Sequence, residues 1–295
     1  MSRTKLNQQP IEHIVRANDV NHCVYEWPGE GPPIFFVHAT GFHARCWDTI
    51  IHYLAGYHAY SVDLRGHGKS DKPEPPYHWR LFGEDVATVV EEMDLRNLIG
   101  VGHSMGGHSI ALAAGLQPHR FAGLVLCDPS IMAPDHYQKY REPSTTEHPV
   151  AKRRNEWSSA QEMYERFLNR SPFNTWRPEM LWDYCKHGLL PATNGEGFVL
   201  ACPPRIEAAM YGSGDHGDIF QALKNITFPV HVLRAKERTA SDTADEFRAS
   251  VTWPGLADHL VKGKDYSMPK LSHFVPQEVP DVVAWHIQQL VKMAG

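Results

Sequence analysis

The stretch IGVGHSMGGHSIALAAG, residues 99–115, joins two different sequence patterns at a single serine. The residues before Ser104 form an apolar run with β-branched side chains, typical of a buried strand, and the small residues after it are typical of a closely packed helix. Gly102 and Gly106 lie two residues before and two residues after the serine. A sharp turn from strand to helix needs small residues there because its two arms pass close together. The stretch therefore predicts a strained turn that presents the Ser104 hydroxyl at the positive end of a helix.

The neighbouring sequence alternates between strand-like and helix-like segments. The expected strands cover residues 12–17, 21–29, 32–39, 58–64, 97–103, 121–128, 228–235 and, more weakly, 259–266. The expected helices cover residues 44–56, 79–94, 104–116 and 280–294. The first two strands predict an antiparallel hairpin, and the alternation that follows predicts an α/β fold with a mostly parallel central sheet flanked by helices. This context favours a nucleophilic Ser104 over a serine that only caps a helix.

Between residues 130 and 226 the pattern changes to helical, aromatic-rich segments interrupted by proline and glycine. We therefore expect a core domain formed by residues 1–129 and 227–295, with a mostly helical cap inserted at 130–226. Most aromatic residues of such a cap serve as its own apolar core, and a minority face a pocket. The expected substrate carries a small or medium apolar acyl or aryl group.

The charge balance argues against two classes of partner. Lysine and arginine total 29 against 34 acidic residues, which gives a net charge of -5 without any basic block. Such a chain offers little attraction to nucleic acid or to an anionic membrane surface. The first residues lack the apolar run of a signal peptide, and no apolar run approaches the length of a membrane span. We expect a cytoplasmic protein.

The cysteines and histidines do not form recognisable metal or disulfide patterns. The five cysteines include no CxxC pair, and an odd count leaves at least one unpaired, so we expect reduced and mostly buried thiols. The 19 histidines include no HExxH motif and no Cys/His cluster at zinc-finger spacing. We expect neither a metal nor an organic cofactor.

Four motifs resemble those of the α/β-hydrolase fold family, in that family's order and over nearly the whole chain. They are FFVHATGF (35–42, a strand and oxyanion loop), VDLRGHGKSDKP (62–73, the loop after the next strand), VGHSMGG (101–107, the nucleophile elbow) and LSHFVPQEVPDVV (271–283, the histidine segment). The resemblance implies a nucleophilic Ser104, with His273 as the base that takes its proton. It also implies that the insertion is the family's cap.

The acid that orients the histidine is less clearly marked. In most of the family it follows the strand read here at 228–235, but this sequence has AKER there, with Arg238 in the expected place and Glu237 one residue away. Some members carry the acid after the preceding strand, where Asp128 stands. The resemblance therefore favours Asp128 over Glu237, with Asp242 third, although an Asp-Pro pair at a strand end is often only a turn former.

The remaining expectations concern the oxyanion and the reaction. His-Ala-Thr replaces the usual His-Gly-x, so the resemblance implies that the backbone N–H groups of Thr40 and Met105 form the oxyanion hole. The expected reaction is hydrolysis of a small-molecule ester or lactone through an acyl-enzyme. The same triad also serves carbon-carbon bond hydrolysis in diketones and amide hydrolysis, and some members look like receptors without turnover. These alternatives stay open, as does assembly into a homodimer.

Overall fold

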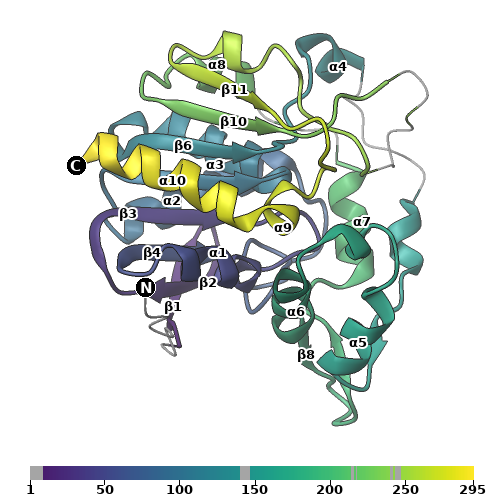
Figure 1. Cartoon of the computed structure of the whole chain (residues 1–295). Coiled ribbons are helices and arrows are strands. Elements are labelled where there is room, and N and C mark those ends of the chain that lie inside the picture. Colours follow the sequence, from purple (N-terminus) through teal and green to yellow (C-terminus); the bar gives the residue numbers. More distant parts are fainter. Residues whose placement is uncertain (1–8, 140–146, 214–215, 217, 240–241, 243–246) are drawn as a thin grey trace.

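A computed structural model of the chain describes residues 9–139, 147–213, 216, 218–239, 242 and 247–295. Its centre is an eight-stranded sheet in the order β1-β2-β4-β3-β5-β6-β10-β11 (Figure 1). The strands are β1 Ile11–Ala17, β2 Val20–Trp27, β3 Glu30–Val37, β4 Tyr57–Val62, β5 Leu98–His103, β6 Phe121–Cys127, β10 Val230–Arg234 and β11 Gly263–Ser267. The hairpin β1/β2 and the pair β2/β4 are antiparallel, and the other pairs are parallel. The predicted fold class is confirmed.

Helices cover both faces of this sheet. They are α1 Asp48–Tyr53, α2 Trp79–Glu92, α3 Met105–Leu116, α8 Ile219–Leu223, α9 Val275–Glu278 and α10 Pro280–Ala294, with the 3-10 turns η1 Ala44–Trp47, η2 Pro118–Arg120 and η5 Ala257–His259. Side chains of a strand point alternately to its two faces. Phe35 and Val37 of β3 accordingly pack in the core layer under α2, α3 and α8, whereas Ile34 and Phe36 pack in the layer under α1 and α10.

A smaller unit lies beside the sheet's carboxyl edge, and its elements α5, α6 and β8 are at the lower right of Figure 1. Its described elements are α4 Pro134–Lys139, η3 Pro149–Lys152, β7 Glu156–Trp157, α5 Ala160–Phe167, η4 Phe173–Thr175, α6 Pro178–His187, β8 Leu189–Pro191, β9 Phe198–Leu200 and α7 Pro204–Tyr211. Besides helices it contains the small antiparallel sheet β7-β9-β8, which the sequence patterns did not predict. The limits of core and cap at residues 130 and 226 stay a prediction.

One expected helix is shorter than its pattern suggested. The segment 44–56 divides into η1 and the six-residue α1. In the insertion, α5 begins only at Ala160, because Glu156 and Trp157 pair with β9 and Ser159 then caps the helix by accepting a hydrogen bond from the Glu162 N–H. The spacing of apolar residues alone does not show where a helix N-cap such as Ser159 sets the start of a helix.

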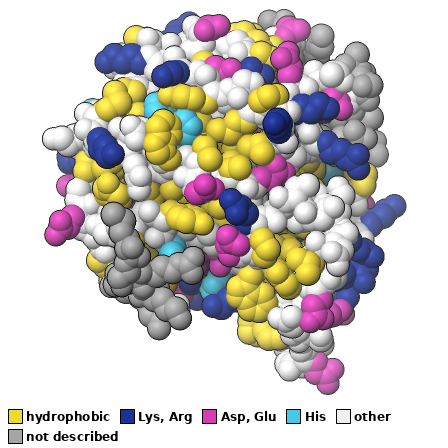
Figure 2. All heavy atoms as spheres, in the orientation of Figure 1, with side chains coloured by type: hydrophobic (Ala, Val, Ile, Leu, Met, Phe, Trp, Pro, Cys, Tyr) yellow, Lys and Arg dark blue, Asp and Glu magenta, His cyan; other side chains and the backbone are white. Residues whose placement is uncertain are grey.

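The surface drawn in Figure 2 carries acidic and basic side chains interspersed with hydrophobic ones. Within the described residues, no helix has the length and apolar character needed to cross a membrane. All five cysteines are free and buried, as predicted.

Candidate active site

Ser104 stands at the turn between β5 and α3, where the backbone adopts φ 55° and ψ -121°. A positive φ is unfavourable for a residue with a side chain, so the surrounding structure must hold the turn in place. A Cβ added at Gly102 would lie 2.4 Å from the Gly106 carbonyl oxygen, and one added at Gly106 would lie 2.3 Å from the Val37 carbonyl oxygen. The two glycines therefore allow β5, α3 and β3 to approach closely enough to form the predicted elbow.

The structure brings Ser104, His273 and Asp128 into one chain of hydrogen bonds. The Nδ1 atom of His273 lies 2.6 Å from Asp128 Oδ2, and its Nε2 lies 2.9 Å from Ser104 Oγ. Because the ionised carboxylate only accepts, Nδ1–H donates to Asp128, and Nε2 of the neutral ring is left to accept the Ser104 proton. The three residues come from the ends of β5 and β6 and from the loop between β11 and α9.

Asp128 is fully buried and receives three further hydrogen bonds. The Ala235 N–H and the Ser250 hydroxyl donate to Oδ1, and the Val251 N–H donates to Oδ2. Burial favours the neutral acid, but the hydrogen bonds from His273, Ser250 and Ala235 outweigh it and lower the pKa of Asp128. Sequence reasoning missed Ser250, because nothing near it in the chain marks it as a partner of Asp128.

The alternative acids do not join this chain of hydrogen bonds. Glu237 has an exposed side chain beyond the end of β10. The carboxylate of Asp242 accepts hydrogen bonds from the backbone and hydroxyl of Thr239. Of the three candidates, the structure places only Asp128 against His273 within the described residues.

The segment after β3 holds Thr40 beside the serine. Thr40, Ser104 and His273 border the same cavity, and the Thr40 hydroxyl donates to the Met105 sulfur at 3.3 Å. His38 fixes this loop, since its Nε2 accepts from the Leu64 N–H and its Nδ1–H donates to the Ala39 carbonyl. The Met105 N–H belongs to the first residue of α3, where helix N–H groups lack partners within the helix.

A second hydroxyl lies close to the serine and was also missed at the sequence level. Ser130 Oγ is 3.2 Å from Ser104 Oγ, and the Ser130 N–H donates to the Ser104 carbonyl. Both side chains are buried. Ser130 follows Asp128 by two residues, so the turn that places the acid also places this hydroxyl.

The cavity in front of Ser104 has a volume of about 170 Å³. Aromatic and other apolar side chains make most of its wall: Phe42, Pro172, Phe173, Trp176, Tyr184, Tyr211, Phe247 and Phe274. Arg153 and Glu207 are the charged members of the described wall. A mostly apolar pocket with a few polar groups is typical of small-molecule sites.

A family model described as the alpha/beta hydrolase family matches residues 34–284. The chain belongs to the α/β-hydrolase family. The match includes the elbow at Ser104, Asp128, the insertion at residues 130–226, and His273.

Individual relatives of this α/β hydrolase match over shorter segments. A non-heme chloroperoxidase of Streptomyces lividans is 36% identical over 117 residues, which cover 38% of this chain and 42% of that protein. An esterase of Mycobacterium tuberculosis is 32% identical over 134 residues, which cover 45% of this chain and 44% of that protein. The chain thus matches less than half the length of each of these relatives.

Solved structures match the whole α/β-hydrolase fold at low identity. The crystal structure of E-2-(acetamidomethylene)succinate hydrolase has a TM-score of 0.72 at 19% identity and covers 96% of this chain and 99% of that chain. The enol-lactonase of Burkholderia xenovorans has a TM-score of 0.65 at 17% identity and covers 95% of this chain and 100% of that chain. At these identities the likeness shows the fold alone.

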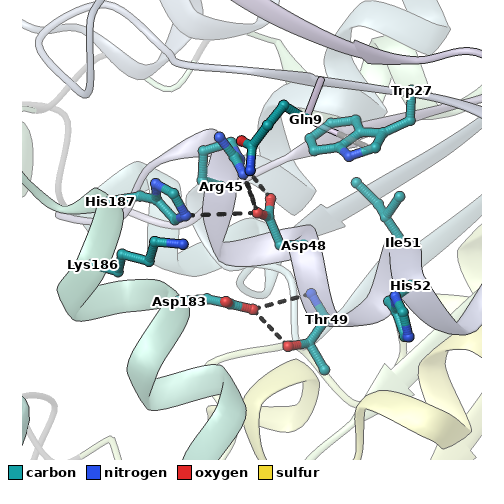
Figure 3. A pocket seen from close by; sticks show the side chains of 10 residues that line it. All are labelled: Gln9, Trp27, Arg45, Asp48, Thr49, Ile51, His52, Asp183, Lys186 and His187. Atoms are coloured by element: carbon teal, nitrogen blue, oxygen red, sulfur yellow. Dashed lines mark hydrogen bonds and ion pairs between the residues drawn. The ribbon is translucent and has the colours of Figure 1, made fainter. Parts of the chain in front are cut away.

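This α/β hydrolase has a second, polar pocket where η1 and α1 face α6 (Figure 3). The Thr49 N–H and hydroxyl both donate to Asp183, which joins the two units at this point. Burial and the nearby negative charge of Asp48 raise the pKa of Asp183 to about 7. Within the described residues, no cluster of three metal-ligating side chains exists here or elsewhere.

Proposed function

We propose that this protein is a serine hydrolase that cleaves small carboxylic esters, lactones among them, through an acyl-enzyme. The observation that carries the proposal is the hydrogen-bond chain Ser104–His273–Asp128, whose serine borders an apolar cavity. A serine hydroxyl is a weak nucleophile unless a base removes its proton, and this arrangement supplies the base and the group that orients it.

The proposed reaction proceeds in two half-reactions. Ser104 Oγ attacks the ester carbonyl while His273 Nε2 takes its proton, and the resulting imidazolium gives this proton to the alcohol as it leaves. Water then attacks the acyl-enzyme, with its proton passing to His273 and from there to Ser104, which releases the acid. Asp128 holds the ring with Nδ1 protonated and stabilises its positive charge throughout.

We propose that the backbone N–H groups of Thr40 and Met105 donate hydrogen bonds to the negatively charged oxygen of the tetrahedral intermediate. Thr40 borders the cavity next to Ser104, and Met105 begins the helix that follows it. Preorganised N–H donors of this kind contribute strongly to catalysis because they need not reorient as charge develops.

The size and lining of the cavity restrict the substrate. A volume of about 170 Å³ and an aromatic wall suit a short or medium acyl group. The similarity to an esterase agrees with ester chemistry. The five free, buried thiols agree with a reducing compartment, so we also propose that the protein works in the cytoplasm.

The test is a reactive phosphonate ester together with a chromogenic short-chain ester. The phosphonate should label Ser104 alone, as read by peptide mass spectrometry, and the ester should give sustained turnover that Ser104→Ala abolishes. Binding without turnover would instead favour a receptor. A label on another residue, or full activity in Ser104→Ala, would remove the nucleophile assignment.

A panel of esters, lactones, amides and diketones separates ester hydrolysis from the other reactions that one triad can perform. Ester or lactone turnover well above that of amides and diketones is the expected result. Faster turnover of amides or diketones than of esters and lactones would show that the same triad performs a different hydrolysis from the one proposed.

A further inference from the structure

An ion pair forms part of the wall of the active-site cavity. Arg153, just after η3, donates from Nη1 to Glu207 Oε2 on α7 at 2.5 Å, and from Nη2 to the Tyr184 hydroxyl on α6 at 2.9 Å. The exposed fractions of the Arg153 and Glu207 side chains are 22% and 6%. All three residues border the same cavity as Ser104. The pair is therefore available to a bound substrate and largely shielded from bulk water.

The pair keeps hydrogen-bonding capacity beyond its own contacts. A guanidinium carries five N–H donors, and within the described residues Arg153 uses one toward Glu207 and one toward Tyr184. Glu207 lies against the oxyanion loop, because a Cβ added at Gly41 would come 2.4 Å from its Oε1. Glu207 thus lies on the cavity wall beside the loop that carries Thr40, and Arg153 is hydrogen-bonded to it.

The charges of the pair decide which polar group fits. A substrate carboxylate carries acceptors only, so it could bond to Arg153 but would be repelled by the neighbouring Glu207 carboxylate in a poorly solvated site. A purely apolar group would leave the remaining donors and acceptors without partners, which is costly where water is excluded. An uncharged amide offers an oxygen for Arg153 and an N–H for Glu207, and so matches both members.

We propose that Arg153, Glu207 and the Tyr184 hydroxyl form a subsite for an uncharged amide-like group on the acyl part of the substrate. This rests on the proposed ester hydrolysis and narrows its substrate class to acyl groups that end in, or contain, a carboxamide. The surrounding aromatic wall holds the carbon chain between that group and the ester.

The test compares 4-nitrophenyl esters of matched shape. One series carries a terminal carboxamide, as in the esters of succinamic, glutaramic and adipamic acid. A second carries a free carboxylate at the same place, and a third carries an isopropyl group of similar size. The three chain lengths probe the reach between Ser104 and the subsite. At the best length, kcat/KM for the carboxamide should exceed that for the carboxylate by about tenfold or more, and should also exceed that for the isopropyl compound.

The variant Glu207→Gln removes one charge while keeping the shape of the side chain. Arg153 then has no anionic partner at this contact, so the preference should shift by at least about tenfold toward the carboxylate series. Glu74→Gln is the matched control, because Glu74 pairs with Arg205 of the same helix α7 in an exposed ion pair. That variant should keep the wild-type ranking.

Wild-type preference for the carboxylate or isopropyl series at every length would overturn the subsite, as would an unchanged ranking in a folded Glu207→Gln protein. If Glu207→Gln does not fold, the wild-type ranking decides alone. Calorimetric titration of the same compounds into Ser104→Ala measures the ranking without turnover. If the protein hydrolyses the esters but does not prefer the carboxamide series, only the subsite is refuted. If it binds the carboxamide series best but hydrolyses none of the esters, only the proposed reaction is refuted.

Discussion

Among single residues, Asp128 is the one whose role the sequence left most open. Its carboxylate lies 2.6 Å from His273 Nδ1, whereas the Glu237 side chain is exposed. In Asp128→Asn the ring loses the partner that holds Nδ1 protonated, so we expect kcat for an ester to fall by up to ~10⁴-fold, as in other triads. Glu237→Gln should keep nearly full activity. Steady-state kinetics of both variants check this, and a larger loss in Glu237→Gln would contradict the assignment.

The hydroxyl of Ser130 provides a second prediction for a single residue. It lies 3.2 Å from Ser104 Oγ and is placed to donate to this oxygen when the serine proton moves to His273. Removing one neutral hydrogen bond of about 1 kcal/mol in Ser130→Ala should slow phosphonate labelling of Ser104 by about fivefold. The control is Ser109→Ala, whose hydroxyl bonds to the Met105 carbonyl instead. Equal labelling rates for Ser130→Ala and the wild type would exclude this role.

At the scale of elements, the packing of β5, α3 and β3 depends on Gly106. Adding a methyl group there brings carbon within 2.3 Å of a backbone oxygen of Val37, which cannot turn away as a side chain can. Gly106→Ala should therefore lower the free energy of unfolding by at least the ~1–3 kcal/mol typical of overpacking. Thermal unfolding measures the loss. Gly212→Ala, whose added carbon meets nothing closer than 3.7 Å, is the control and should change stability little.

The contact between α1 and α6 should make stability depend on pH. The pKa of Asp183 is raised from 3.8 to about 7 by burial and by Asp48. Between these values the folded chain keeps a proton that the unfolded chain has released, so this group's contribution to stability decreases as pH rises and levels off above about pH 7. In Asp183→Asn the side chain does not ionise, so this contribution to the pH dependence of stability is removed.

Thermal unfolding at about pH 5 and about pH 8 tests the contact. Asp183→Asn should show a smaller change in Tm between the two values than the wild type, because its amide oxygen still accepts from Thr49 but does not ionise. Glu196→Gln, at an exposed position, should retain the wild-type dependence. An identical pH response in Asp183→Asn and the wild type would show that Asp183 is ionised throughout.

For the whole molecule, short-range sequence patterns predicted the strands of the central sheet and the turn at Ser104 well. The apolar segments of β3 and β5 identified buried parallel strands, and the glycine spacing around Ser104 identified the elbow. Both depend on residues close together in the chain. The motif around His273 is far from the elbow in the chain, and in the structure its Nε2 lies 2.9 Å from Ser104 Oγ, 169 positions away.

Contacts that depend on tertiary structure were not predictable in the same way. The partners of Asp128 at Ala235, Ser250 and Val251 come from segments over 100 residues away, and no local pattern marks them. The β7-β9-β8 sheet consists of strands of two or three residues, too short for an alternating pattern to show. The Arg153–Glu207 pair joins two helical segments whose spacing gives no sign of contact.

The two parts of the molecule meet at Trp176. Its ring lies 5.6 Å from Phe42 and 5.1 Å from Phe274 of the core, and 4.9 Å from Phe173 on its own side. The side chain is only 6% exposed and also borders the cavity. A change at this residue should therefore affect both stability and the space available to the acyl group.

Trp176→Ala should lower the free energy of unfolding by about 3–5 kcal/mol, the usual cost of truncating a buried aromatic ring. The enlarged cavity should also shift the best substrate toward longer acyl chains in a series of 4-nitrophenyl esters. Trp182→Ala is the control, because that residue is 36% exposed and its ring packs against Tyr164 rather than against the core. Loss of stability without any shift in chain-length preference would mean that Trp176 joins the two parts but does not limit the acyl group.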